Sequence, residues 1–325
     1  MIIFVIMYMD RKDLLILKEL DLDVRASIGQ IARKTRISKE TVQYRIQRLE
    51  KEKIIQGYWG FPNIGNDTVL YKVFLKNKGL SSDDKNAFEK FTSKTPEVSW
   101  FAKTTGSWTY IITLVSCHDW KISQFLSDLF EKFSDKFTDI QIIKSISAIS
   151  LREKYLFDEL TIKPIYNDFL KDPISLNETE KKVIQFLSIN ARAKYIEIAK
   201  KLNCTGEAIS QSFKQITKKK AIKDLKLRVN HQKLGFSYYH LMIGFSNGES
   251  IKRAEEYFTY DKTSVFLMRH VGKYQLHVEI VCPSSDIDDI VDDFLDSFSK
   301  DVADYNLCKI EKEFKIQVNQ GLSQI

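Results

Sequence analysis

The chain has 325 residues, of which 43% are hydrophobic and 29% charged, and it holds only 12 Gly and 5 Pro. This composition excludes disordered, collagen-like and low-complexity proteins, and the length predicts two or three globular domains. Its four cysteines form no Cys-x-x-Cys pair, which indicates neither a disulfide framework nor a structural zinc site and favours a reducing, cytoplasmic location. The net charge of +7 is clustered, because residues 176–230 hold 13 Lys and Arg against 5 Asp and Glu and residues 10–57 hold 12 against 8, a pattern typical of nucleic-acid binding.

Residues 1–9 form an apolar run that is too short to span a bilayer, which takes about 20 residues, and that has no basic flank or cleavage site of a signal peptide. We therefore expect no membrane association. Two interpretations of the run stay open. It is either a strand that pairs elsewhere in the fold or a translated extension ahead of a true start at Met9.

Residues 10–57 carry the 3.6-residue apolar period of three helices, over 10–20, 27–35 and 39–52. The third begins at a good N-cap, Ser38, and buries Val42, Ile46 and Leu49 on one stripe. This order predicts a helix-turn-helix unit: the second and third helices are joined by a short turn, and the first helix completes the core. In such a unit the last helix enters a DNA major groove. The stripe leaves the candidate DNA-binding residues facing outward, namely Lys39, Thr41, Gln43, Tyr44, Arg45 and Arg48.

The apolar period changes from 3.6 to 2 after residue 68. Strands are predicted over 68–76, 98–105, 108–115 and 138–149, and helices over 81–93 and 119–133. The order βαββαβ predicts a ferredoxin-like antiparallel sheet with both helices on one face. Apolar residues also lie on the other face, so we expect that face to pack against a second sheet.

The same order of elements occurs twice in the chain. Residues 177–224 align without a gap on 10–57, placing Arg192 on Arg25 and Ala199 on Ala32, and a second βαββαβ order follows over 237–318. The second copy starts its third helix at Thr205 and is richer in lysine, which favours phosphate contacts over base reading. Its candidate DNA-binding residues are Ser210, Gln211, Ser212, Lys214 and Lys218.

The predicted fold class is α+β, with two winged helix-turn-helix units that are each followed by a ferredoxin-like domain. We expect the two halves to pair within one molecule as an intrachain pseudo-dimer, which can assemble further into a homo-oligomer. The predicted divisions are helix-turn-helix domains at 10–60 and 176–230, ferredoxin-like effector or dimerisation domains at 61–153 and 231–320, and a linker at 154–175.

The run over residues 25–58, followed by a βαββαβ module with Gly106 between its central strands, resembles the leucine-responsive/AsnC (Lrp/AsnC) family of transcription regulators. The first copy is the closer match, through Arg45, Arg48, Gly57 and Tyr58. The resemblance implies a sequence-specific regulator whose third helix binds double-stranded DNA. It also implies that the βαββαβ module mediates dimerisation and binds a small-molecule effector.

The candidate effector-binding residues lie in two turns, Thr104, Thr105, Gly106, Ser107 and Thr109 in one and Arg269, His270, Gly272 and Gln275 in the other. The family commonly has Gly-x-x-Asp here, whereas this chain has Thr109 and Gln275 at the acidic position. The ammonium of an amino acid would therefore lack its carboxylate partner, which argues against amino-acid sensing. Plain turns without a ligand are the alternative.

No catalytic or metal-binding constellation is predicted, because none of the five histidines has a neighbour at a diagnostic spacing, although His277 and Glu279 share one strand face. We expect no cofactor and no enzymatic activity. Two alternatives stay open. Some proteins of this architecture are tetrapyrrole (siroheme) decarboxylases, in which role Arg269, His270 and His277 would hold substrate carboxylates; otherwise, the chain is a protein-interaction module with vestigial DNA-binding units.

Overall fold

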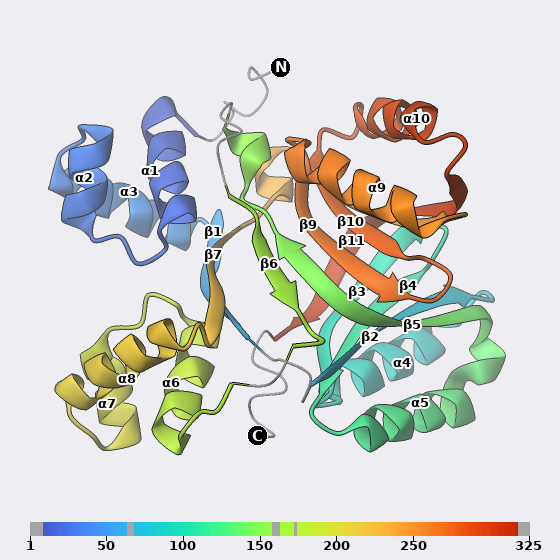
Figure 1. Cartoon of the computed structure of the whole chain (residues 1–325), viewed down its shortest axis with the longest axis horizontal. Helices are drawn as coiled ribbons and strands as arrows, with labels where there is room; N and C mark the ends of the chain where they lie inside the picture. Colours follow the sequence, from blue (N-terminus) through green and yellow to red (C-terminus); the bar gives the residue numbers. More distant parts are fainter. Residues whose placement is uncertain (1–8, 64–67, 158–162, 172–173, 318–325) are drawn as a thin grey trace.

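The computed structural model describes residues 9–63, 68–157, 163–171 and 174–317. Two units of three helices lie on one side of the molecule, joined by a two-stranded ribbon, and a large sheet with four helices outside it forms the other side (Figure 1). Of the apolar run at residues 1–9, only Met9 belongs to the described residues, so both interpretations of that run stay predictions. No described helix combines the length and apolar character that crossing a membrane requires.

The first helical unit consists of α1 (Arg11–Leu22), α2 (Ile28–Thr35) and α3 (Lys39–Lys51), which confirms the three predicted helices. Side chains at the N-caps fix where each begins: Asp10 and Ser27 form capping boxes, and Ser38 accepts a hydrogen bond from the backbone of Thr41. The predicted stripe of α3 is buried against α1 and α2. The unit therefore has its own apolar core.

The second helical unit consists of α6 (Glu178–Ile189), α7 (Tyr195–Leu202) and α8 (Gly206–Lys218). Thr205 caps α8 as predicted, since its hydroxyl accepts the backbone N–H of Ala208. The turns before α3 and α8 also correspond, because Arg36 (φ 58°) and Asn203 (φ 51°) both adopt the left-handed conformation that ends α2 and α7. Both units thus use the same local geometry.

A two-stranded antiparallel ribbon, β1 (Ile55–Pro62) with β7 (Ile222–Val229), joins the helical units. Neither strand is among the predicted elements. Two glycines and a proline weaken the strand signal of β1, whereas β7 carries a short alternation, Leu225, Leu227 and Val229, that was missed. Gly60 is needed where α6 packs on the ribbon, since a Cβ there would lie 2.9 Å from the carbonyl oxygen of Leu187. The ribbon is consequently held against the second helical unit.

The large sheet is a closed ring of eight antiparallel strands, which corrects the expectation of two stacked sheets. Its order is β2-β4-β3-β11-β8-β10-β9-β5, and β5 also pairs with β2. The two longest strands cause the closure, because β5 leaves β2 to pair with β9 and β11 leaves β8 to pair with β3. The strands are β2 (Val69–Asn77), β3 (Val98–Gly106), β4 (Tyr110–Ser116), β5 (Phe137–Ser150), β8 (Ser237–Phe245), β9 (Ser264–Val271), β10 (Leu276–Cys282) and β11 (Val302–Ile316).

Four helices cover the outside of this ring, two from each half of the chain (Figure 1). They are α4 (Ser82–Lys94), α5 (Asp119–Phe133), α9 (Gly248–Tyr260) and α10 (Ile287–Ser297). Phe88 centres the core under α4 and α5, and Phe258 centres the core under α9 and α10. Phe74 and Met242 come from the opposite strand faces and belong to a separate apolar cluster inside the ring. The faces that bear no helix therefore turn inward.

The predicted linker at 154–175 is partly structured. It contains the short strand β6 (Ile165–Asp168), which pairs with β5. The buried ammonium group of Lys154 donates hydrogen bonds to the backbone oxygens of Thr259 and Asp261. These contacts fasten the start of the segment to the second half. Three short 3₁₀ turns complete the described elements, η2 (Ser134–Lys136), η3 (Lys154–Leu156) and η4 (Gln232–Leu234).

Candidate DNA-binding surface and ligand cavity

Part of the predicted reading face of α3 is exposed. Lys39, Gln43 and Tyr44 point to solvent, and Tyr44 retains 65% of its accessible surface. Thr41 is half-buried, and its hydroxyl accepts a hydrogen bond from the Ser38 hydroxyl at 2.9 Å. Three of the predicted side chains are therefore free to contact a groove, whereas Thr41 helps to form the N-terminal cap.

The two arginines of α3 are already bound by acidic residues of the same unit. Arg45 contacts the carboxylates of Asp10 at 2.6 Å and Asp13 at 2.9 Å, and Arg48 contacts Asp13 at 2.5 Å. Although partial burial opposes ionisation, the hydrogen bond from Arg45 lowers the pKa of Asp10 below its ordinary value. A DNA phosphate or base would have to compete with these carboxylates.

The face of α8 differs, because its lysines are available. Gln211, Lys214 and Lys218 are exposed, whereas Ser210 and Ser212 are half-buried. Neither Lys214 nor Lys218 forms an ion pair within the described part of the chain. The next residue, Lys219, binds Glu180 at 2.7 Å and thereby ties the end of α8 to α6. The cations of α8 are thus better placed for phosphates than the arginines of α3.

Two arginines, Arg25 and Arg192, dock the helical units onto each other reciprocally. Arg25 donates to the backbone oxygens of Ala191 and Ala193, and Arg192 donates to those of Val24 and Ala26. Each guanidinium also lies over aromatic rings, with Arg25 5.0 Å from the centre of Phe213 and Arg192 5.2 Å from that of Tyr58. These contacts and the ribbon hold α3 and α8 in one relative position.

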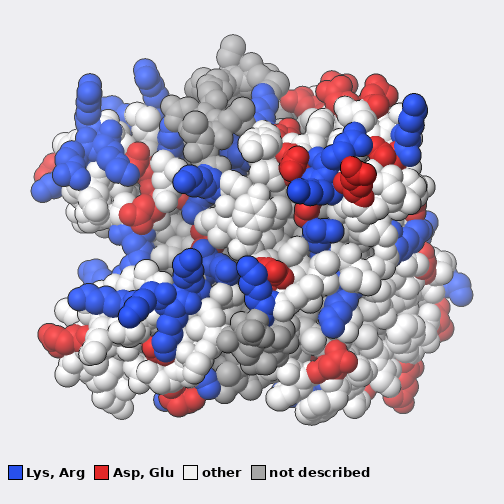
Figure 2. All heavy atoms as spheres, viewed as in Figure 1, with Lys and Arg blue, Asp and Glu red and all other residues white. Residues whose placement is uncertain are grey.

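The charged side chains are unevenly distributed over the surface. Lys and Arg gather over the two helical units at the left of Figure 2, whereas Asp and Glu gather around α10 at the upper right. The acidic side chains of α10 include Asp288, Asp289, Asp292 and Asp293. The molecule therefore presents a basic side made of the helical units and an acidic side made of α10.

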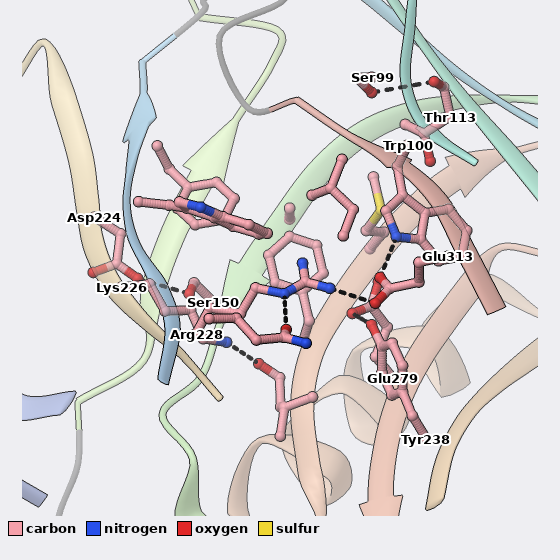
Figure 3. A pocket seen from close by; sticks show the side chains of 18 of the residues that line it. Ser99, Trp100, Thr113, Ser150, Asp224, Lys226, Arg228, Tyr238, Glu279 and Glu313 are labelled. Carbon is pink, nitrogen blue, oxygen red and sulfur yellow. Dashed lines mark hydrogen bonds and ion pairs between the residues drawn. The ribbon is translucent and has the colours of Figure 1, made fainter. Parts of the chain in front are cut away.

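A cavity of about 870 Å³ lies between the ribbon and the sheet ring. Its aromatic walls include Trp59 from β1 and Trp100 from β3. Arg228 of β7 lies 4.3 Å from the ring centre of Trp59 and donates to Glu313, which also accepts the indole N–H of Trp100 at 2.7 Å. Figure 3 shows Arg228, Trp100 and Glu313 meeting at this junction. A ligand here would touch both the ribbon and the ring.

The side of the cavity toward the ring is partly apolar, with Leu70, Val115 and Met268, and partly polar. Lys72 is buried there, with its ammonium nitrogen 5.0 Å from the ring centre of Trp100. Burial lowers the pKa of Lys72 to about 8, although the charge of Glu279 opposes the shift. The hydroxyl of Tyr238 donates to Glu279, which also lines the cavity. This wall can bind either an anion or a cation.

Three buried histidines lie close to this wall inside the ring, namely His240, His270 and His277. His270 shares a hydrogen bond with Ser145 at 3.0 Å, while both ring nitrogens of His240 and of His277 have no hydrogen-bond partner among the described residues. Burial lowers the pKa of all three, that of His270 to about 3. Sequence reasoning noticed His277 and Glu279 but missed His240, because only the register of β8 against β10 places it opposite Glu279.

The candidate effector residues of the first turn are mostly bound within the fold. Thr104 is buried and donates to the backbone oxygen of Trp108 at 2.6 Å, Thr105 donates to Glu311, and Thr109 accepts from the backbone of Asn77. Gly106 and Ser107 line a second cavity of about 550 Å³ together with Asp288, Val291, Asp292, Tyr305 and Leu307. The acidic wall of this cavity comes from α10 in the other half of the chain.

The candidate residues of the second turn do not join that cavity. Gln275 accepts from the backbone of Phe245 and donates to the backbone oxygen of Gly272, so its side chain closes its own turn. Arg269 lies 3.7 Å from Glu255, and His270 points into the ring. The structure therefore does not assemble the two predicted turns into one site, and their effector role stays a prediction.

Comparisons with known proteins agree with the helical unit at the start of the chain. Residues 9–56 match the winged helix-turn-helix DNA-binding family. An uncharacterized HTH-type transcriptional regulator of Pyrococcus abyssi is 28% identical over 103 residues, which cover 32% of this chain and 70% of the relative. The HTH-type transcriptional regulator LrpA of Pyrococcus horikoshii is 36% identical over 62 residues, covering 19% and 44%. The resemblance to regulators of the Lrp/AsnC kind is thus confirmed.

A solved structure matches the whole chain in fold. The crystal structure of the siroheme decarboxylase NirDL covers 94% of this chain and 93% of its own, with a TM-score of 0.61 and 13% sequence identity. A second crystal structure of that decarboxylase is a complex with an iron-uroporphyrin III analogue and has the same TM-score. At this identity the likeness concerns the fold. The relatives are named regulators and this solved structure is an enzyme, so the expectation of no enzymatic activity stays a prediction.

Proposed function

We propose that the chain is a sequence-specific DNA-binding transcription regulator of the Lrp/AsnC type that acts as an intrachain pseudo-dimer. Helix-turn-helix domains at 10–60 and 176–230 contact double-stranded DNA in the cytoplasm, and the ferredoxin-like domains at 61–153 and 231–320 support them. The proposal rests chiefly on the reciprocal docking of Arg25 and Arg192, because it gives α3 and α8 one fixed separation. A fixed separation selects a spacing between two DNA half-sites.

The two reading helices have different roles in this proposal. Gln43 and Tyr44 of α3 address base edges, while Lys214 and Lys218 of α8 hold phosphates. Arg45 and Arg48 join the contact only where DNA displaces Asp10 and Asp13 from them. A small molecule in the 870 Å³ cavity would change the position of the ribbon, and with it the separation of the helices.

The test is a selection from random-sequence DNA with the purified full chain, followed by fluorescence anisotropy on the enriched sequence. Tyr44→Ala is expected to weaken binding about tenfold, which corresponds to a loss of about 1.4 kcal/mol. Tyr260→Ala is the matched control, because this tyrosine of α9 is 72% exposed and α9 lies on the sheet ring, away from the two helical units (Figure 1). Failure to enrich any sequence would instead support the interaction-module alternative.

The second candidate function is tetrapyrrole binding and decarboxylation. The cavity favours it, because its volume and its two tryptophans suit a large aromatic ligand, and Lys72 lines it as a cation for a carboxylate, whereas Arg228 is bound to Glu313. The fold likeness to the decarboxylase adds support. The residues first considered for this role fit less well, since Arg269 contacts Glu255 and does not line the cavity. Adding siroheme to the full chain tests the idea: a Soret shift and a product lighter by carbon dioxide would establish it, and an unchanged spectrum would refute it.

A further inference from the structure

Three side chains on the neighbouring strands β8 and β10 meet inside the sheet ring. His277 and Glu279 alternate along β10 and so point to the same face, and His240 lies directly opposite Glu279 in the register of the two strands. The potential ligand atoms of these residues all lie within 4.8 Å of one another. His240 and His277 are fully buried, and their ring centres are 4.6 Å apart.

The imidazoles of these residues lack hydrogen-bond partners in an environment where partners are normally required. Within the described part of the chain, both nitrogens of His240 and both nitrogens of His277 are buried and unpaired. Glu279 Oε1 lies 3.8 Å from His240 Nε2, which is too far for a hydrogen bond. Buried polar atoms normally have a partner, so these two adjacent imidazoles, unpaired among the described residues, are available as ligands.

The carboxylate of Glu279 is held ready for such a group. Tyr238 donates a hydrogen bond to its Oε2, so that Oε1 is left facing His240. Glu279 and Tyr238 also line the 870 Å³ cavity, whereas the histidines lie deeper. An ion at this position would therefore have three protein ligands and one open side toward the cavity. A hydrogen bond from an outer residue to a ligating carboxylate is the usual arrangement at metal centres.

We propose that His240, His277 and Glu279 bind a divalent transition-metal ion, a site that goes beyond the proposed DNA-binding function. Two imidazoles and one carboxylate are a ligand set that suits Zn²⁺ or Fe²⁺. Ligand atoms about 2.0–2.2 Å from one ion lie about 3–3.5 Å apart. The three ligand atoms, which lie within 4.8 Å of one another, therefore have to draw closer by about 1 Å to hold one ion. The open fourth position admits water or a cavity ligand.

A competing interpretation is that Lys72 and the histidines bind an anion instead of a metal ion. Substitution of Lys72 distinguishes the two. Its ammonium group lies in the same part of the ring and lines the cavity. If the site holds a cation, Lys72→Met removes a like charge and tightens metal binding. If the site holds an anion, the same substitution weakens binding of a carboxylate such as benzoate, and metal binding is absent.

The experiment titrates the metal-stripped full chain with Co²⁺, read by its visible absorption, and with Zn²⁺, read by calorimetry. One ion per chain is expected, with a loss of at least 100-fold in affinity in His240→Ala and in His277→Ala and about tenfold in Tyr238→Phe. His118→Ala, outside the cluster, and Cys204→Ser, which removes an exposed thiol, should leave the affinity unchanged. Metal binding that survives both histidine substitutions, or that is lost in Cys204→Ser, would overturn the proposal. Unfolding curves of each variant establish that it is folded, and Lys72→Met tests the site without removing a ligand.

Discussion

At the scale of single residues, Asp13 controls whether the arginines of α3 are available. Its side chain is 1% exposed and binds both Arg45 and Arg48. The sequence pattern places both arginines on the outer face of α3, opposite the buried stripe. A side chain on that face can still bind a neighbouring helix, and here the arginines bind a residue of α1. The pairing with Asp13 joins residues more than 30 positions apart, which a local pattern does not encode.

Asp13→Asn is expected to have opposite effects on stability and on DNA binding. Removing the charged partner of two guanidinium groups should lower the free energy of unfolding by about 2 kcal/mol. The released arginines should raise affinity for non-specific DNA. Urea unfolding and anisotropy measure the two effects. Glu40→Gln is the matched control, because it removes one acidic charge from an exposed position on α3; equal DNA affinities of the two variants would contradict the role of Asp13.

A second residue-scale feature is the buried carboxyl group of Asp21, which joins α1 to the start of the linker. One of its oxygens accepts the backbone N–H of Glu153 at 3.0 Å, and the other has no hydrogen-bond partner among the residues that the structure describes. Burial and the charge of Glu153 together raise the pKa of Asp21 to about 7. The folded protein therefore keeps a proton on Asp21 that the unfolded chain releases near pH 4.

This pKa shift predicts a pH-dependent effect of Asp21→Asn. Between pH 4 and 7 the folded state binds the proton more tightly than the unfolded state, so Asp21 makes the protein less stable as the pH rises. The amide lacks this titration, and the variant should gain stability relative to the parent, by up to about 4 kcal/mol at pH 7.5. Urea unfolding at pH 4.5, 6.0 and 7.5 measures the difference. A difference that is constant across this range would exclude the predicted titration.

At the scale of elements, the turn between β3 and β4 depends on a glycine. Gly106 has φ +108°, and a Cβ there would lie 2.4 Å from the backbone oxygen of Leu307 in β11. Gly79 is a useful contrast, because it has φ +95° and a Cβ at that position would meet no atom within 4 Å. The first glycine therefore allows a turn and a close approach of strands, and the second only a turn.

Alanine substitutions separate these two requirements. Gly79→Ala should cost about 1–2 kcal/mol of unfolding free energy through its backbone conformation alone. Gly106→Ala should cost about 1–3 kcal/mol more, because β11 must move away from the new methyl group. Chemical denaturation of both variants gives the comparison. Equal losses would mean that β11 does not pack against this turn as described.

The helical units depend on each other through Arg25 and Arg192. Each donates to backbone oxygens of the other unit, and removal of one should cost about 1.5–3 kcal/mol, as hydrogen bonds from charged groups do. The prediction is faster amide hydrogen exchange in β1 and β7 for Arg25→Ala. Arg33→Ala, exposed on α2, serves as control. If both variants exchange alike, the docking of the two units is not what holds the ribbon.

At the scale of the whole molecule, the basic side formed by the helical units predicts binding that depends strongly on salt. A protein that neutralises phosphates releases counterions, so its affinity falls with a slope of about 0.9 per phosphate on logarithmic axes. The double substitution Lys214→Ala with Lys218→Ala should lower this slope by about 2. Anisotropy between 50 and 300 mM salt measures it, with Lys90→Ala on α4 as control. A slope that the double substitution leaves unaltered would remove α8 from the DNA contact.

Local sequence patterns were enough to predict most of the helices and strands. The stripe of Val42, Ile46 and Leu49, the caps at Ser38 and Thr205, and the alternating strands follow from interactions between residues a few positions apart, and these predictions were confirmed. The sequence pattern determined β1 poorly, because Gly57, Gly60 and Pro62 hide the alternation. These features are decided by short-range sterics and hydrogen bonding, which a single segment already contains.

Only the tertiary structure decided how the segments meet. It closed eight strands into a ring instead of stacking two sheets, paired Arg45 with Asp13, created the cavity under the ribbon, and brought His240 to His277 and Glu279. Each of these outcomes depends on the register between strands or helices that are tens to hundreds of residues apart. Register is set by the packing of all partners at once, because a shift of one residue reverses which face every side chain occupies.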